Sequence, residues 1–171
     1  MTTFTTIAFT TMPSPVGELT LYATDAGLRA VLWENDRGAP TDLVEAAVED
    51  RDHPVLRAAV VQLEEYFAGT RSEFDLPLDP HGTPFQQKAW EVLRTIPYGA
   101  TISYGEQARR LGVPSAARAV GAANGRNPIP IIVPCHRVVG SDGSLTGFAA
   151  GVESKAWLLH HERGRLRLPL M

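Results

Sequence analysis

Cys135 is the only cysteine of this 171-residue chain and the residue best suited to covalent chemistry. It lies between Pro134 and His136 in the stretch IPIIVPCHRVVG, with Arg137 one residue further on. Free cysteines are usually buried and inert. Basic neighbours, however, lower the pKa of a thiol toward neutrality and so increase its nucleophilic thiolate fraction. The residues around Cys135 therefore leave an inert side chain and a reactive thiolate as evenly matched alternatives.

A thiolate nucleophile needs a base and a group that orients this base. His136 is adjacent to Cys135, and because neighbouring side chains of a strand diverge, a tight turn is needed for the imidazole to reach the thiol directly or through a water. The best candidate for the orienting carboxylate is Glu162, near the end of the apolar segment KAWLLHHE. A glutamate that faces the core there needs a buried partner such as His136. A solvated helix end is the alternative for Glu162.

The segments before the cysteine must hold it in place. The apolar run over residues 131–133 predicts a short buried strand, which Pro134 ends because proline cannot donate to a sheet. Further upstream, Thr83 predicts the start of a helix. Pro84 suits the first helical position, and Gln86 stands three residues after the cap, where it can complete a capping box.

Residues 104–127, YGEQARRLGVPSAARAVGAANGRN, predict a short helix, a break at Gly-Val-Pro and a second helix that begins near Ser115. This arrangement is typical of a helix-turn-helix, although similar helix pairs occur in proteins that never bind DNA. The second helix consists almost entirely of small residues, and only Arg118 projects far from it. Its backbone is therefore expected to be able to approach a groove closely.

The N-terminal part alternates extended segments with turn signals, in the order FTTIAFTT, SPVG, ELTLYA, TDAG and LRAVLW. This pattern predicts a small antiparallel meander. A short helix is expected over residues 41–49, and apolar spacing predicts a second helix over residues 54–69 that covers one sheet face. The segment EFDLPLDPHG, residues 73–82, lacks periodicity and is expected to link two domains, residues 1–80 and 81–171. The expected fold class is α+β, with a mostly helical C-terminal domain.

Charge is distributed unevenly along the chain. The net charge is −3, which alone argues against a nucleic-acid-binding protein, but residues 1–80 carry −9 and residues 81–171 carry +6. Between Glu106 and Asp142 there is no acidic residue. This interval contains Arg109, Arg110, Arg118, Arg126 and Arg137. An anion-binding surface is one interpretation, and a basic face that complements the acidic half is the other.

Composition excludes several classes of protein. One cysteine excludes an internal disulfide and a zinc site built from several thiolates, and we expect neither a metal nor a cofactor. No apolar stretch approaches the 18 or so residues of a membrane span, and the N-terminus lacks the basic start of a secretory signal. We therefore expect a cytoplasmic protein with no membrane partner.

Several segments together resemble a known family. They are FQQKAWEVLRTIPYGATISYGE, AARAVG and NPIPIIVPCHRVVGSDGSLTGFAAGVESKAWLLHHE, supported by SPVGELTLYATDAGLRAV and LEEYFAG nearer the N-terminus. These segments are similar to the O6-alkylguanine-DNA alkyltransferases of the bacterial one-cysteine type. The resemblance covers nearly the whole chain, its PCHR motif is highly specific, and it implies a ribonuclease H-like N-terminal domain.

The resemblance implies direct reversal of DNA damage. A methyl or other alkyl group would pass from O6 of guanine, and from O4 of thymine, to Cys135 in a single turnover. His136 would act as the base through a water, with Glu162 holding the imidazole. Asn127 would tie the second helix to the active-site turn, and Tyr104 would donate a proton to the departing guanine.

The resemblance also assigns substrate and DNA contacts. The carbonyls of Cys135 and Val138 would accept the guanine amine, while Pro130, Phe148 and Ala149 would line the pocket. The partner would be double-stranded DNA bound through its minor groove, with the alkylated nucleotide flipped out and Arg118 in its place. The implied DNA contacts are Ser115, Ala116, Ala117, Arg118, Gly121, Ala122 and Arg126. The protein would be a monomer in solution, with several molecules on one duplex, and would act at the bacterial nucleoid.

One loop departs from the family pattern. Relatives commonly have Tyr-Ser-Gly-Gly or Tyr-Gly-Gly-Gly where this chain has Phe-Ala-Ala-Gly, residues 148–151. Any role of a tyrosine or serine hydroxyl is therefore lost, although the Ala149 amide can still donate a hydrogen bond. The Ala150 methyl is expected to crowd bulky substituents, so O6-methylguanine should react faster than O6-benzylguanine.

Two other classes share some of these features. A Cys-His hydrolase that acts on acyl substrates would share Cys135 and His136 but would not need an arginine-rich helix pair. A helix-turn-helix regulator would bind DNA without using the thiol at all. Relatives that bind damaged DNA without repairing it replace the nucleophile, so Cys135 argues against that class.

Overall fold

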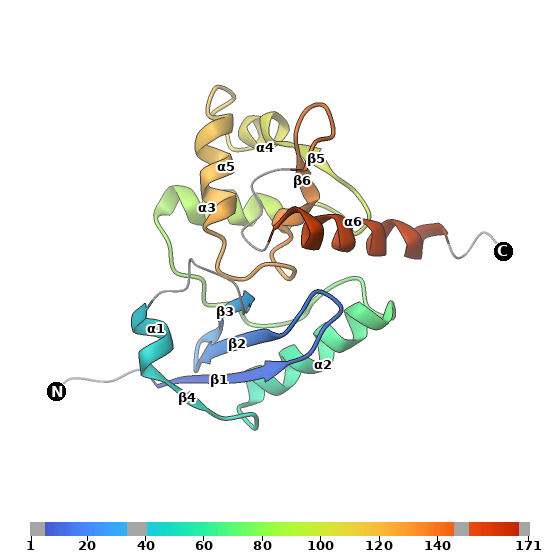
Figure 1. The fold of residues 1–171 in the computed structure, drawn as a ribbon. Coiled ribbons are helices and arrows are strands. Elements are labelled where there is room, and N and C mark those ends of the chain that lie inside the picture. Colours follow the sequence, from blue (N-terminus) through green and yellow to red (C-terminus); the bar gives the residue numbers. More distant parts are fainter. Residues whose placement is uncertain (1–5, 34–40, 146–150, 168–171) are drawn as a thin grey trace. The chain divides into compact units, whose positions relative to one another are not determined.

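The computed structural model describes residues 6–33, 41–145 and 151–167. The chain forms two compact units, residues 1–81 and residues 82–171, whose elements are shown in Figure 1. The N-terminal unit contains a sheet with helices, and the C-terminal unit is mostly helical. The expected α+β fold class is confirmed.

A four-stranded sheet with the order β3-β2-β1-β4 forms the centre of the N-terminal unit. Strands β1 (Ile7–Met12), β2 (Leu19–Thr24) and β3 (Gly27–Trp33) are antiparallel neighbours, as the turn signals predict. Helix α2 (Pro54–Ala68) packs against all three strands. It ends at Gly69, whose φ of 82° is the left-handed conformation that glycine adopts without strain.

The helix predicted over residues 41–49 is only partly correct. Helix α1 covers Thr41–Ala46, and the next residues form β4 (Ala47–Glu49), which pairs in parallel with β1. The outer edge of β1 offers unpaired backbone groups, so pairing with that edge overrides the local helical preference. The sheet is therefore mixed rather than purely antiparallel.

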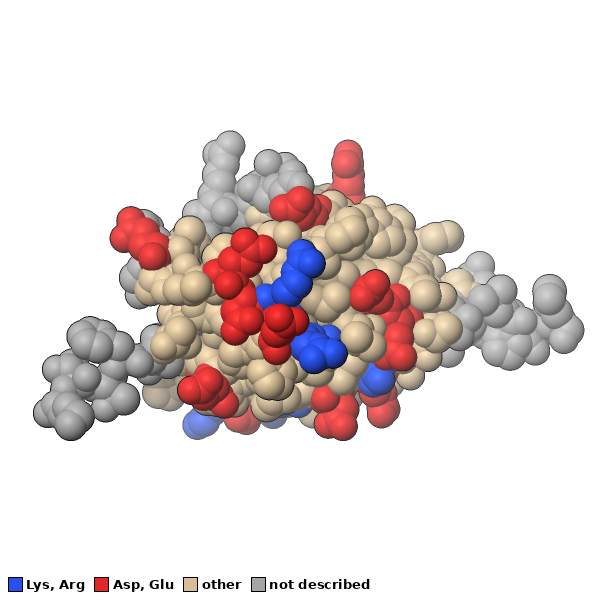
Figure 2. All heavy atoms as spheres, turned by 90° about the horizontal axis from the view of Figure 1, so that it is seen from below, with Lys and Arg blue, Asp and Glu red and all other residues tan. Residues whose placement is uncertain are grey.

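The N-terminal unit has an acidic surface. Exposed carboxylates on α1, on β4, in the following turn and on α2 include those of Glu45, Glu49, Asp50, Asp52 and Glu64. Figure 2 shows acidic side chains spread over one face of the molecule, with fewer basic ones among them. The excess of acidic over basic residues in the N-terminal part of the sequence therefore appears on the surface of this unit.

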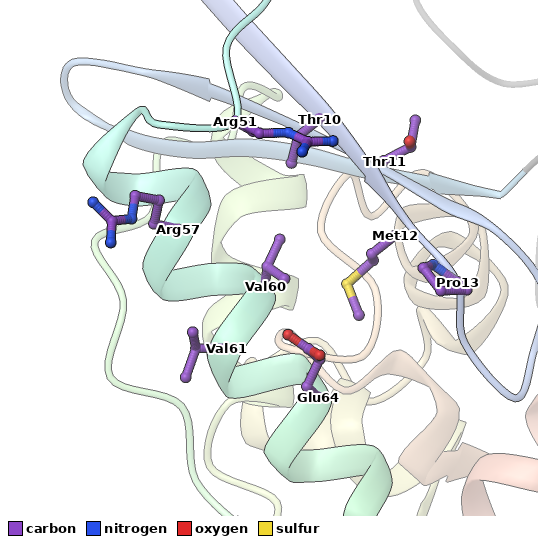
Figure 3. Close-up of a pocket in the computed structure, with 9 residues that line it drawn as sticks. All are labelled: Thr10, Thr11, Met12, Pro13, Arg51, Arg57, Val60, Val61 and Glu64. Atoms are coloured by element: carbon purple, nitrogen blue, oxygen red, sulfur yellow. The ribbon is translucent and has the colours of Figure 1, made fainter.

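A pocket of about 360 Å³ lies between β1 and α2 (Figure 3). Met12 and Val60 supply apolar wall, and the Glu64 carboxylate points toward the same space. The lining residues are Thr10, Thr11, Met12, Pro13, Arg51, Arg57, Val60, Val61 and Glu64. None of the residues expected to carry the chemistry lines this pocket.

Three helices form the scaffold of the C-terminal unit: α3 (Pro84–Leu93), α4 (Tyr104–Arg110) and α5 (Ala117–Gly125). Helix α3 begins with the predicted capping box, in which Thr83 and Gln86 exchange side-chain and backbone hydrogen bonds of 3.1 and 2.9 Å. Helix α5 begins two residues later than Ser115 and has no side-chain cap. It packs against both α3 and α4, so a helix pair of the expected type is present.

A buried pair of amides fixes the spacing of these three helices. Gln107 on α4 and Asn124 on α5 exchange two hydrogen bonds of 3.0 and 2.7 Å. Gln107 also donates to the Ala89 carbonyl on α3. Trp90 adds a further link, because its indole N–H donates to the Ala123 carbonyl at 2.8 Å. Both amide side chains are buried with their polar groups paired, which favours one arrangement of the helices over others.

The apolar run before the cysteine is not a strand, so that prediction was wrong. Residues 129–133 form a turn, in which the Val133 N–H donates to the Ile129 carbonyl at 2.9 Å. Ile131 has φ of 74°, a conformation that β-branched residues rarely adopt. Because prolines flank this run and lack the N–H that a sheet ladder requires, the apolar side chains are buried in a turn instead.

Short elements follow the turn. The 3₁₀ helix η1 (Cys135–Arg137) leads into β6 (Val138–Val139), which pairs in parallel with β5 (Ile102–Ser103). Helix α6 (Val152–Arg167) packs against η1. The cysteine therefore stands on a one-turn helix between the buried turn and a two-residue strand.

We predict that the Gln107–Asn124 pair is strongly coupled. Gln107→Leu should lower the free energy of unfolding by about 1 to 3 kcal/mol, because it leaves the Asn124 amide buried without its partner. The double variant with Asn124→Leu should lose less than the sum of the two single variants. Urea unfolding of the four proteins measures the coupling. Gln87→Leu, on the exposed side of α3, is the matched control. If the losses of unfolding free energy at positions 107 and 124 simply add up in the double variant, the two amides are not coupled.

Candidate active site

Cys135 begins η1 and is 7% exposed. Its N–H donates to the Val133 carbonyl at 2.8 Å, which anchors Cys135 to the end of the buried turn. His136 follows within the same helical turn, so the tight turn that the sequence required for this pair is present. The site is therefore built from local backbone geometry around one buried thiol.

The expected lowering of the thiol pKa is wrong. Burial raises the pKa of Cys135 to about 11, and this effect outweighs the opposing influence of the Asn127 side chain and the Lys155 charge. The sequence argument failed because it counted Arg137 as a neighbour of the thiol, whereas the Arg137 guanidinium binds the Glu162 carboxylate instead. At neutral pH the resting thiol is protonated and needs a base.

His136 and Glu162 form a buried pair. The His136 Nε2 lies 2.7 Å from Glu162 Oε2, and both side chains are at most 1% exposed. A carboxylate can only accept a hydrogen bond, so Nε2 must carry the proton when the imidazole is neutral. Nδ1 is buried and has no hydrogen-bond partner among the described residues. Its lone pair is therefore the one available to accept a proton.

The Glu162 carboxylate accepts hydrogen bonds on both oxygens. The Arg137 guanidinium binds it in a two-pronged contact, with Nε 2.8 Å from Oε1 and a terminal nitrogen 3.1 Å from Oε2. The Gly99 N–H also donates to Oε1 at 3.3 Å. Burial alone would raise the pKa of Glu162, but hydrogen bonds and charges from His136 and Arg137 hold it far below its usual range. Glu162 is a buried carboxylate and not the solvated helix end that was its alternative.

Asn127 holds both ends of the turn that precedes the nucleophile. Its amide nitrogen donates to the Val133 carbonyl at 2.8 Å, and its amide oxygen accepts the Ile129 N–H at 3.0 Å. Since Asn127 follows the C-terminal end of α5 by two residues, it connects this helix to the backbone beside Cys135.

Tyr104 contacts a residue that sequence reasoning missed. The Lys155 ammonium lies 3.5 Å from the Tyr104 hydroxyl. Lys155 is only 1% exposed, and its charge acts on the Cys135 thiol. Burial lowers the pKa of Lys155. A signal was present in the sequence, because Lys155, Leu158 and Glu162 share one helical face and so face the core together.

The expected pocket residues are described only in part. Val138 is fully buried and Pro130 is buried, and the Val138 N–H donates to the Cys135 carbonyl. Phe148, Ala149 and Ala150 lie outside the described residues.

The arginine-rich interval divides into three groups. Arg109 and Arg110 both pair with Glu106 on α4. Arg137 is buried at Glu162, so the five arginines do not form one surface as expected. Arg118 and Arg126 remain exposed, on α5 and at its end, without an ion pair among the described residues. Around them, the exposed residues of α5 are Ala119, Ala122 and Gly125.

Within the described residues, no helix is both long and apolar enough to span a bilayer. Over the same part of the chain, no three histidine, cysteine or acidic side chains converge in a way that suits a metal ion.

Family models of 6-O-methylguanine DNA methyltransferase match both units. The ribonuclease-like domain matches residues 7–80, and the DNA binding domain matches residues 84–164. The chain belongs to the 6-O-methylguanine DNA methyltransferase family.

Individual relatives of this methyltransferase family are similar over their whole length. The methylated-DNA–protein-cysteine methyltransferase of Mycobacterium tuberculosis H37Rv is 49% identical over 159 residues, which cover 93% of this chain and 94% of the relative. The constitutive enzyme of Bacillus subtilis is 44% identical over 156 residues, with coverage of 91% and 94%. A crystal structure of M. tuberculosis OGT in complex with DNA matches with a TM-score of 0.84 and 47% identity, covering 92% of this chain and 94% of the other.

We predict that Glu162→Gln destabilises this family member most at neutral pH. A carboxyl whose pKa is lowered by folding contributes stability above its ordinary pKa of about 4.3, and this contribution is lost as the pH falls toward the lowered value. Removing the charge from a buried, paired site should cost about 3 to 5 kcal/mol at pH 7. Urea unfolding at pH 7 and at about pH 4 should show that the gap between wild type and variant narrows in acid.

Glu91→Gln is the matched control, because Glu91 is exposed on α3. It should leave the unfolding free energy unchanged at both pH values. A Glu162→Gln protein as stable as the wild type at pH 7 would show that the buried carboxylate charge contributes no net stability.

Proposed function

We propose that this chain repairs alkylated DNA by transferring an alkyl group from O6 of guanine to the Cys135 sulfur. The observation that carries the proposal is the buried His136–Glu162 pair next to the only cysteine. Both the named relatives and the family models support it. By the same displacement the site would also act on O4 of thymine.

The reaction is a displacement at the alkyl carbon. His136 Nδ1 accepts the thiol proton through a water, and the sulfur attacks the carbon attached to O6. A carbon–sulfur bond forms, the carbon–oxygen bond breaks, and its electron pair stays on the guanine. Tyr104 then donates a proton to the leaving base. Lys155, 3.5 Å from the phenol oxygen, stabilises the negative charge that remains there.

The raised pKa of Cys135 makes the base essential to this mechanism. The thiol is unreactive until His136 accepts its proton, and Glu162 stabilises the imidazolium that results. A thioether product has no route back to a thiol in this site. Each molecule therefore reacts once.

The C-terminal unit is proposed to perform both DNA binding and transfer. Helix α5 would lie in the minor groove with its small residues against the sugar edges, and the contacts would be Ser115, Ala116, Ala117, Arg118, Gly121, Ala122 and Arg126. A base within a duplex is out of reach of a buried thiol, so the alkylated nucleotide must be flipped out. Arg118 is exposed near the start of α5 and would fill the gap.

Other parts of the proposal concern the pocket and the setting. The carbonyls of Cys135 and Val138 would accept the guanine amine, while Pro130, Phe148 and Ala149 would line the space for the alkyl group. The protein would act as a monomer in the bacterial cytoplasm, with several molecules on one duplex of the nucleoid.

Repair should be stoichiometric, with one methyl group per protein and only on Cys135. Incubation with a duplex that contains O6-methylguanine, followed by peptide mass analysis, locates the methyl group. Cys135→Ser should abolish transfer but keep its DNA affinity, because phosphate contacts dominate binding and lie elsewhere. Sustained turnover with excess substrate would refute the proposal.

The same experiment separates the competing functions. A Cys-His hydrolase would release a burst of product from an activated ester and leave the methylated duplex unchanged. A helix-turn-helix regulator would bind DNA equally well with or without the thiol and would leave O6-methylguanine intact.

Arg118→Ala should slow repair of duplex DNA far more than the reaction with free O6-benzylguanine. Only the duplex imposes the cost of unstacking a base, which amounts to a few kcal/mol. Second-order rates on both substrates measure the difference. Arg94→Ala, at the exposed end of α3, is the control and should change neither rate. Equal losses on both substrates would exclude the role assigned to Arg118.

A further inference from the structure

Arg137 is held at the active site by three sets of contacts. Its guanidinium makes the two-pronged bond to Glu162, and a second terminal nitrogen donates to the Ile96 carbonyl at 2.7 Å. The guanidinium carbon lies 5.7 Å from the centre of the Tyr98 ring. The side chain is 8% exposed. An arginine that is buried and directed in this way has a fixed position relative to the carboxylate.

The pairing determines the charge balance around His136. A buried carboxylate that faced the imidazole alone would favour the imidazolium form, since this form completes an ion pair. Arg137 supplies a permanent positive charge to the same carboxylate, because a guanidinium does not lose its proton in proteins. The Glu162–Arg137 pair is then neutral before His136 accepts any proton.

Few other charges oppose this effect. Helix α6 contributes Glu162 and Lys155, and η1 contributes Arg137, to the charged groups that act on His136. Helix α3 also packs against η1, but its charged side chains are exposed. These are Lys88 and Glu91, with Arg94 at its C-terminal cap. Glu162 is thus the only carboxylate that acts on His136 among the described residues, and Arg137 already occupies it.

We propose that Arg137 is the positioning residue that keeps His136 neutral and able to accept the thiol proton, by neutralising the carboxylate between them. The inference rests on the proposed function, since it assigns the base of that reaction. Both oxygens of Glu162 are used, and the imidazole meets the carboxylate through Nε2 only. The pKa of His136 is lowered, first by burial and further by Arg137 and Lys155, against the raising effect of Glu162.

Two substitutions separate charge from geometry. Arg137→Met keeps a flexible unbranched side chain and removes the charge, whereas Arg137→Lys keeps the charge and loses the two-pronged contact. Rates are measured with free O6-benzylguanine, so that DNA affinity does not contribute, between about pH 6 and pH 9, where a histidine titrates. The pKa of His136 is measured by NMR titration of each unreacted protein. Arg94→Met is the control, because this arginine is exposed.

The Arg137→Met variant should have a raised His136 pKa and a rate that recovers as the pH rises. Its rate at pH 7 should fall by about tenfold for each unit by which that pKa exceeds the assay pH. Arg137→Lys should stay close to the wild-type profile, as should Arg94→Met. Loss of rate by the same factor at every pH would indicate a merely structural role and would overturn the proposal.

The wild-type protein supplies a test that needs no variant. His136 should be neutral at pH 7 in the NMR titration, and a protonated imidazole there overturns the inference even if Arg137→Met does not fold. Failure of the proposed function is a separate result, because it would show as wild-type protein that gains no alkyl group on Cys135.

Discussion

The rest of the C-terminal unit depends on one interaction, the pairing of the buried Glu162 carboxylate with four hydrogen-bond donors. It connects α6 to η1 through His136 and Arg137, and to the segment after α3 through Gly99. Removing any donor would leave a buried charge underpaired, which is far more costly than losing a surface ion pair. The orientation of the His136 imidazole is therefore set by the same contacts that join the surrounding elements.

Much of this arrangement could be predicted from local sequence rules. The capping box of α3 follows directly from Thr83 and Gln86, and the strands β1 to β3 follow from alternation and turn residues. The argument about buried charge named Glu162 as a candidate partner of His136 but left a solvated helix end open, and the family resemblance decided between them. These features share one property: the deciding interaction lies within a few residues or requires only that a polar group be paired.

Three of the errors have the opposite origin, since each depended on a distant partner. β4 forms because the edge of β1 is available, which residues 41–49 alone do not reveal. The direction of the Cys135 pKa depends on where Arg137 points, and Arg137 points to a residue 25 positions away. The burial of Lys155 was not predicted, because a lysine is rarely buried. Tertiary contacts decided all three, and sequence spacing carried little information about them.

The strained turn before the nucleophile can be understood from the unfolded chain. Ile131 in the left-handed region costs about 1 to 3 kcal/mol, and no strand or helix supports residues 129–133. Pro128, Pro130 and Pro134, however, restrict the backbone before folding, so less conformational entropy is lost when this segment becomes ordered. This smaller loss of conformational entropy offsets part of the strain energy at Ile131. Cys135 thus follows a segment that has no helix or strand of its own and whose unfolded conformations were already restricted.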